Sequence, residues 1–125
     1  MRILGIDPGI AIVGYGVVDK EGNSYKTVAY DAVTTRAHTP LGERLELVYK
    51  GIDEIIKMYR PDVMSIEELF FNNNAKTAIA VGQARGVILL AAVHNSIPVF
   101  EYTPLQVKQA LTGYGRASKG QIQQM

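Results

Sequence analysis

The sequence predicts an α/β fold built on a mixed sheet of five strands, in which three antiparallel strands come first and two parallel strands follow. An apolar run at residues 3–6 ends in Asp7, and a second apolar run at residues 63–66 ends in Glu67 and Glu68. Short apolar runs bounded by turn residues are typical of buried strands. Segments with apolar residues at helical spacing separate the later strands, and this alternation predicts parallel pairing through helical crossovers.

Three strands are expected at the start of the chain. The first ends where Pro8 lacks the amide N–H that a sheet needs and Gly9 permits unusual backbone angles. Residues 11–19 are the expected second strand, and its glycines suggest a close backbone approach at the turn. Residues 21–23 read Glu-Gly-Asn, a clear hairpin signal, and a third strand is expected over residues 25–35.

An amphipathic helix is expected next, with Thr39 as a possible cap and Pro40 at a tolerated first-turn position. Charged residues occupy its other side, so the helix should cover one face of the sheet. It ends at residues 60–62, and the fourth strand follows at residues 63–67. The apolar positions at helical spacing are Leu41, Leu45, Val48, Ile52, Ile55, Ile56 and Tyr59.

A second helix, expected over residues 75–95, is apolar nearly all round in its second half. This pattern indicates burial on two sides, and we expect the sheet on one side and a partner subunit on the other. A fifth strand at residues 97–102 and a short helix at residues 105–111 follow. A basic loop at residues 112–117 leads into a last helix without a stop signal before residue 125, so we expect the natural protein to continue.

The order of these elements suggests a ribonuclease H-like architecture with helices on both faces of the sheet, as a single domain over residues 1–125. The chain has no cysteine, which excludes disulfides and thiolate zinc sites, and it shows no signal-peptide pattern. Its longest mostly apolar stretch, residues 87–93, is too short to span a bilayer. We therefore expect a soluble, cytoplasmic protein.

The net charge of +1 hides an asymmetry along the chain. Residues 1–71 contain eight Lys or Arg and eleven Asp or Glu, whereas residues 72–125 contain five basic residues and one acid, Glu101. This distribution is either ordinary scatter or the sign of an acidic site beside a basic surface that binds a polyanion.

The two acidic strand ends predict a metal site. In a parallel pairing Asp7 would lie near Glu67 or Glu68, because neighbouring strands are about 5 Å apart. Side chains alternate along a strand, so periodicity leaves open which glutamate faces Asp7. A lone Asp at a strand end is more often a turn or cap residue, but two such acids in one sheet favour a site. Like charges this close are unfavourable unless a hard divalent cation neutralises them. The chemistry predicted from such a site is magnesium-assisted phosphoryl transfer. His38 and His94 have no partner at metal-ligand spacing and are interpreted as surface or helix-end residues.

Six motifs lie along essentially the whole chain. They are, in order, Gly5-Ile6-Asp7-Pro8-Gly9, Gly14-Tyr15-Gly16, Ile66-Glu67-Glu68-Leu69-Phe70, Gly82-Gln83-Ala84-Arg85-Gly86, Val99-Phe100-Glu101-Tyr102 and Gln106-Val107-Lys108-Gln109. Together these motifs closely resemble the RuvC family of Holliday-junction resolvases. The resemblance implies a ribonuclease H-like nuclease that works as a homodimer and makes two symmetric nicks in four-way DNA junctions, in homologous recombination and DNA repair. It also implies Mg²⁺ or Mn²⁺ as cofactor, with two ions per active site, and a RuvA–RuvB type branch-migration complex as partner.

By position, the resemblance implies that Asp7 and Glu67 are the catalytic, metal-binding carboxylates, and that the helix over residues 75–95 forms the dimer. The resemblance also implies that the domain over residues 1–125 ends before the family's final helix, which carries an acidic pair that completes the catalytic set. Residues 103–125 contain no Asp or Glu. We therefore expect the 125 residues by themselves to be inactive or nearly so.

Six residues are candidates for binding DNA. Phe70 matches the aromatic residue of the family that stacks on unpaired bases, and Phe71 adjoins it. Two of the basic candidates match residues near the scissile phosphate, namely Lys108 and Lys119. The full set is Phe70, Phe71, Arg85, Lys108, Arg116 and Lys119.

Three other functions fit parts of the same pattern. Sugar kinases and actin-like ATPases also begin with an Asp-Gly strand-turn, but they need two copies of the fold, and 125 residues supply one. The remaining alternatives are another ribonuclease H-like nuclease and a non-catalytic DNA-binding or dimerisation module.

Overall fold

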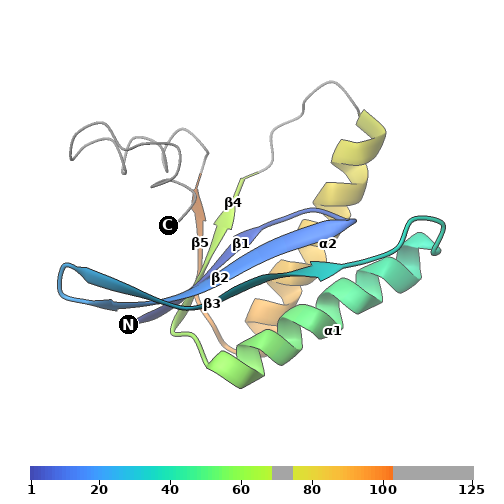
Figure 1. The fold of residues 1–125 in the computed structure, drawn as a ribbon. Coiled ribbons are helices and arrows are strands. Elements are labelled where there is room, and N and C mark those ends of the chain that lie inside the picture. Colours follow the sequence, from blue (N-terminus) through green and yellow to red (C-terminus); the bar gives the residue numbers. More distant parts are fainter. Residues whose placement is uncertain (69–74, 103–125) are drawn as a thin grey trace.

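The computed structural model describes residues 1–68 and 75–102 of the chain (Figure 1). The predicted order of strands and helices is confirmed over these residues. The helix and loop predicted between residues 105 and 117, and the last helix after them, lie outside the described residues. The elements are β1 (Arg2–Asp7), β2 (Ile12–Glu21), β3 (Ser24–Thr34), α1 (Leu41–Tyr59), β4 (Val63–Glu67), α2 (Ala75–His94) and β5 (Val99–Tyr102).

The described strands form one sheet in the order β3-β2-β1-β4-β5 (Figure 1). β1 pairs antiparallel with β2, and β2 pairs antiparallel with β3 through a hairpin in which Gly22 has a φ of 59°. β1 also pairs in parallel with β4, and β4 pairs in parallel with β5. The predicted mixed sheet, with three antiparallel strands followed by two parallel ones, is confirmed, and β1 stands at its centre.

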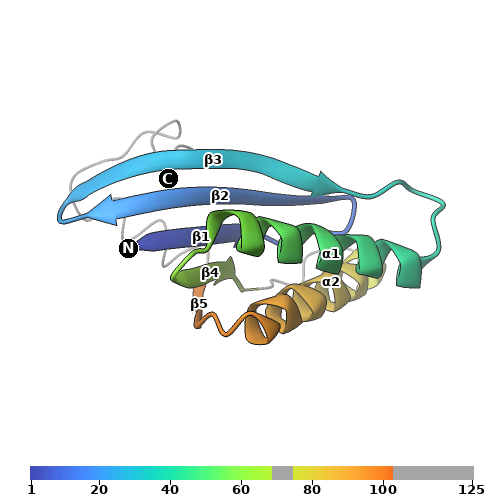
Figure 2. The same cartoon turned by 90° about the horizontal axis from the view of Figure 1, so that it is seen from below.

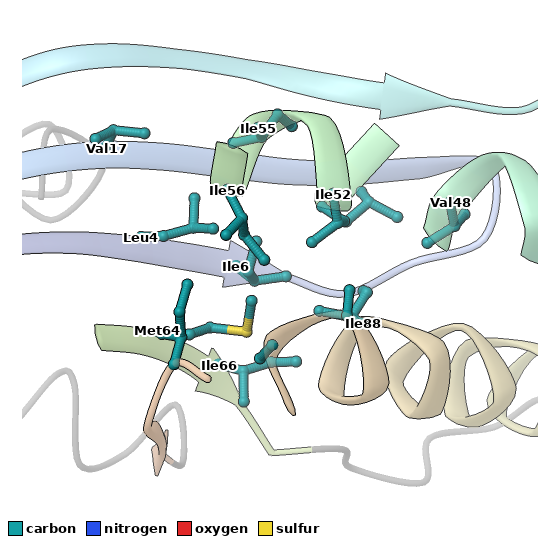
Figure 3. Packing of buried hydrophobic residues seen from close by; sticks show 14 residues of the cluster. Leu4, Ile6, Val17, Val48, Ile52, Ile55, Ile56, Met64, Ile66 and Ile88 are labelled. Carbon is teal, nitrogen blue, oxygen red and sulfur yellow. The ribbon is translucent and has the colours of Figure 1, made fainter. Parts of the chain in front are cut away.

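α1 and α2 pack against each other on the same face of the sheet (Figure 2). Helices on both faces were expected; the helices within the described residues share one face, and the further helices predicted in residues 103–125 lie outside that part of the chain. The core fills the space between these helices and the sheet (Figure 3). Its largest fully buried side chains are Leu4, Ile52, Met64, Ile66, Ile88, Val13, Val17 and Val48.

The alternation of side chains along the central strands separates the core from the opposite face. Leu4 and Ile6 of β1, like Met64 and Ile66 of β4, are buried beneath the helices. Burying each such side chain contributes about 1.5–3 kcal/mol, so these alternating positions determine which face of each strand turns inward. Residues between and after them must point to the other face, because successive side chains of a strand alternate.

α2 is the most apolar helix of the described chain. By length and composition alone, Lys76–His94 could cross a membrane, so the apolar stretch is longer than the predicted residues 87–93. The core helix of a soluble protein passes the same test, and α2 buries Ala84, Ile88 and Ala92 completely. Packing in the core therefore explains why one side of α2 is apolar.

Gly51 of α1 lies directly against Val33 of β3. A Cβ at position 51 would stand 2.8 Å from Cγ1 of Val33 and 3.0 Å from its Cγ2. We expect Gly51→Ala to lower the free energy of unfolding by about 1–3 kcal/mol, because overpacking outweighs the gain of up to about 1 kcal/mol in helix propensity. Urea unfolding measures this loss. In a Val33→Ala background the same change should be neutral or stabilising, and an equal loss in both backgrounds would contradict the packing argument.

Candidate active site

Two carboxylates stand at the carboxyl ends of neighbouring parallel strands. Ile6 of β1 pairs with Ile66 of β4, so the residues that follow, Asp7 and Glu67, lie side by side. Both point away from α1 and α2, because the residues before them are buried beneath the helices. The predicted proximity of the acidic strand ends is confirmed. The choice between the two glutamates is also resolved, since Glu67 interacts with Asp7 and Glu68 is exposed beyond the end of β4.

Glycines surround the backbone on which Asp7 stands. Gly14 of β2 pairs with Asp7, and Gly16 pairs with Gly5. A Cβ at position 14 would lie 3.7 Å from the Cβ of Asp7. Gly14 and Gly16 lie inside β2, within the second strand expected over residues 11–19. Because these positions carry no side chains, β1 and β2 place no side chain of residues 5, 14 or 16 beside Asp7 on this face of the sheet.

The pKa of Glu67 is raised above its ordinary value. Burial of its carboxyl is the main cause, and the negative charge of Asp7 and a hydrogen bond with that residue add to it. Each of these effects disfavours a second negative charge at the same place. The site therefore favours a proton or a cation between the two carboxylates.

The two side chains fit a hard divalent cation. Within residues 1–68 and 75–102, no group of three or more His, Cys, Asp or Glu could hold a metal, so Asp7 and Glu67 are what this part of the chain provides. Magnesium is commonly bound by one or two protein carboxylates together with substrate phosphates and water. The donor set, the mutual repulsion and the position on the face free of α1 and α2 are all consistent with such an ion.

Arg85 of α2 reaches the carboxyl end of β4 from the helix side of the sheet. Its Nε donates to the backbone carbonyl oxygen of Glu67 at 3.3 Å, and its Nη2 lies 3.0 Å from Oε1 of Glu101. The Arg85 side chain is only 14% exposed. Sequence reasoning assigned Arg85 to DNA and did not find its pairing with Glu101. The one signal available was that Glu101 is the only acid after residue 71.

The remaining predicted DNA-binding residues lie outside the described residues. They are Phe70, Phe71, Lys108, Arg116 and Lys119, and their roles stay predictions. The two histidines are surface or helix-end residues, as predicted from the sequence. His38 is exposed in the loop before α1, and His94 is the last residue of α2, where its Nδ1 is hydrogen-bonded to the hydroxyl of Tyr49.

Removing the charge at position 7 should lower the pKa of Glu67. In Asp7→Ala we expect this pKa to fall toward its ordinary value of 4.5 and to stay above it, because burial is the larger cause and remains. As the pH is lowered, the variant therefore protonates Glu67 later than the natural chain does. A ¹³C NMR titration of the side-chain carboxyl measures the difference. Glu68→Ala is the matched control and should leave the titration of Glu67 unchanged, whereas an unchanged titration in Asp7→Ala would show that the two carboxylates do not interact.

Comparison of the sequence with known proteins gives a consistent result. The family model of the crossover junction endodeoxyribonuclease RuvC matches residues 3–125. The RuvC of Clostridioides difficile (strain 630) is 63% identical over 125 residues, which are all of this chain and 74% of that protein. The RuvC of Desulforamulus reducens is 61% identical and is covered to 77% of its length.

Solved structures agree with the sequence comparison. The structure of T. thermophilus RuvC in complex with a Holliday junction substrate is 37% identical, with a TM-score of 0.88 over 98% of this chain and 74% of that one. The yeast mitochondrial Holliday junction resolvase Ydc2 is 12% identical with a TM-score of 0.77 over 98% of this chain and 59% of that one, a likeness of fold alone. The expected ribonuclease H-like architecture is thereby confirmed. With a family match over residues 3–125 and relatives above 55% identity, this chain belongs to the RuvC family of crossover junction endodeoxyribonucleases.

Proposed function

We propose that the protein resolves four-way DNA junctions by metal-dependent hydrolysis of phosphodiester bonds, through paired symmetric nicks in homologous recombination and DNA repair. Membership of the RuvC family supports the reaction. The observation that carries the proposal at the level of residues is the pairing of Asp7 with Glu67 at the ends of adjacent parallel strands, on the face free of α1 and α2.

Asp7 and Glu67 are the residues we assign to the cofactor. These two carboxylates would hold a divalent cation, and the chemistry it would supply is activation of water and stabilisation of the leaving oxygen. The repulsion between the two carboxylates favours its binding, and the glycines at positions 5, 14 and 16 leave room for the phosphate at Asp7. We propose Mg²⁺ or Mn²⁺, with two ions per active site once the acidic pair expected on a last helix is present.

Contacts with the junction are proposed for the second half of the chain. Residues 72–125 carry a net positive charge, with five Lys or Arg and one acid. Positive charge favours binding to the phosphate backbone of DNA. We assign stacking on unpaired bases to Phe70 and Phe71, and phosphate contacts to Lys108, Arg116 and Lys119. A RuvA–RuvB type branch-migration complex is the proposed partner, and the cytoplasm is the proposed compartment.

A homodimer is proposed through the side of α2 that faces away from the core. Ile79, Leu90 and Val93 are exposed large apolar residues of this helix, with exposed fractions of 61%, 46% and 66%. Gly86 lies in the same spacing, and a Cβ there would meet nothing within 4 Å. Residues spaced three, four and seven apart share one side of a helix, so these four form a stripe that a second copy of α2 can contact.

Val93→Asp should weaken the dimer, because a buried unpaired carboxylate is costly. We expect the dissociation constant to rise by about tenfold or more, since each 1.4 kcal/mol is a factor of ten. Sedimentation velocity of the full-length protein over a range of concentrations measures it. Met58→Asp is the matched control, because Met58 is 71% exposed and stands, like Val93, next to the last residue of its helix. Equal effects of the two substitutions would argue against a dimer through α2.

The proposed reaction is tested with a synthetic four-way junction and the full-length protein. We expect Asp7→Asn and Glu67→Gln to slow Mg²⁺-dependent nicking by about two orders of magnitude or more, because each removes a ligand whose ion stabilises the transition state by several kcal/mol. Junction binding should persist, since each change removes a negative charge. Glu68→Gln, the matched control, should nick at close to the natural rate. Binding without nicking by the natural protein would instead favour a non-catalytic DNA-binding module.

A further inference from the structure

The peptide group that follows Glu67 is held from both sides. Its carbonyl oxygen, which belongs to Glu67, accepts the hydrogen bond from Nε of Arg85 at 3.3 Å. Its N–H, which belongs to Glu68, donates to the carbonyl oxygen of Tyr102 at 2.7 Å. One contact comes from α2 and the other from β5, so two elements far from β4 in the sequence meet at a single peptide group.

The other end of the Arg85 guanidinium is anchored by a carboxylate. Nη2 of Arg85 lies 3.0 Å from Oε1 of Glu101, whose own side chain is 46% exposed. Glu101 pairs with Ile66 across β4 and β5, so it stands on the face of the sheet that α2 covers. The guanidinium therefore bridges the ends of two parallel strands. Its planar array of donors suits a carbonyl and a carboxylate at the same time, which the single ammonium of lysine does not.

We propose that Arg85 is a positioning residue for Glu67, and that it acts through the backbone rather than through DNA or the carboxylate. Glu67 is the last residue of β4, where a strand end loosens unless its peptide groups are held. The direction of the Glu67 side chain toward Asp7 depends on the peptide that Arg85 and Tyr102 fix. A misplacement of about 1 Å at a reacting centre can cost a hundredfold in rate, so this contact bears directly on activity.

This role differs from the DNA contact expected from the sequence. A guanidinium that is 14% exposed and paired with Glu101 has little free charge to offer a phosphate. Its contacts are made with the chain itself, on the side of the sheet away from the carboxylates. The inference rests on the proposed function only in its kinetic consequence, and the geometry of the peptide can be tested without DNA.

The test compares two arginines that make the same kinds of contact at opposite ends of the sheet. Arg2 donates to the carbonyl oxygen of Tyr59 and pairs with the carboxylate of Asp19, both at 2.8 Å, at the start of β1. In the full-length protein, Arg85→Met should slow nicking about 10–100-fold, the usual effect of losing a residue that supports a metal ligand. Arg2→Met should leave the nicking rate within about threefold of the natural rate, although it lowers thermal stability at least as much as Arg85→Met does.

Binding separates the positioning role from a DNA contact. In Arg85→Met, junction affinity and its salt dependence should be unchanged, whereas loss of a phosphate contact would weaken binding and reduce the salt slope by about one. Arg85→Lys keeps the charge but not the planar donors, so it should nick well below the natural rate. Weaker, less salt-dependent binding of Arg85→Met, or full activity of Arg85→Lys, would overturn the proposal.

Amide hydrogen exchange provides a readout without metal or DNA. Loss of the Arg85 contact should speed exchange of the Glu68 N–H by about tenfold, the effect of one hydrogen bond to a charged donor. Arg2→Met should leave this amide unchanged. If the Glu68 N–H exchanges equally in the two variants, Arg85 does not position the peptide. If it responds as expected but the natural protein does not nick junctions, the proposed function fails and the structural role stands.

Discussion

The parallel pairing of β1 with β4 is the constraint on which the rest of the site depends. Its register joins Ile6 to Ile66, and this pairing places the next two side chains, both carboxylates, next to each other. A shift of one residue would turn the apolar side chains of β4 outward and Glu67 into the core. The burial of Met64 and Ile66 therefore stabilises the geometry of the site as well as the fold.

The same register divides the sheet between two tasks. The face beneath α1 and α2 is packed with buried side chains such as Leu4 and Ile88. The opposite face presents Asp7, Glu67 and the paired glycines of β1 and β2. Because successive side chains of a strand alternate between the two faces, a carboxylate that directly follows a core residue points to the face away from α1 and α2.

Much of this arrangement could be predicted from the sequence because it follows from local patterns. Apolar runs that end in Asp7 and in Glu67 indicated two buried strands, and hairpin and helix signals indicated how they are connected. The choice between Glu67 and Glu68 could not come from periodicity, because it depends on where β4 meets β1. The strand that contains Gly14 and Gly16 was predicted, but their pairing with Asp7 and Gly5 was not, because the register between β1 and β2 cannot be derived from local patterns.

The partners of Arg85 were beyond sequence reasoning because they depend on contacts between residues far apart in the chain. A helix pattern shows that position 85 lies on α2, but it does not show that the guanidinium meets β4 and β5. An arginine near an expected DNA-binding site is easily assigned to phosphate. Its low exposure and its pairing with Glu101 point instead to a role within the protein.

The contacts of Arg85 also bear on the cation proposed for Asp7 and Glu67. A guanidinium paired with the Glu67 carboxylate would lower the pKa of that carboxyl and occupy the oxygens that a metal needs. Arg85 instead contacts the carbonyl oxygen of Glu67 and places its charge against Glu101, on the helix side of the sheet. The pKa of Glu67 stays raised by burial and by Asp7. Arg85 thus contacts Glu67 without neutralising its carboxylate, and the negative charge of the two carboxylates remains available to the ion that we propose for the reaction.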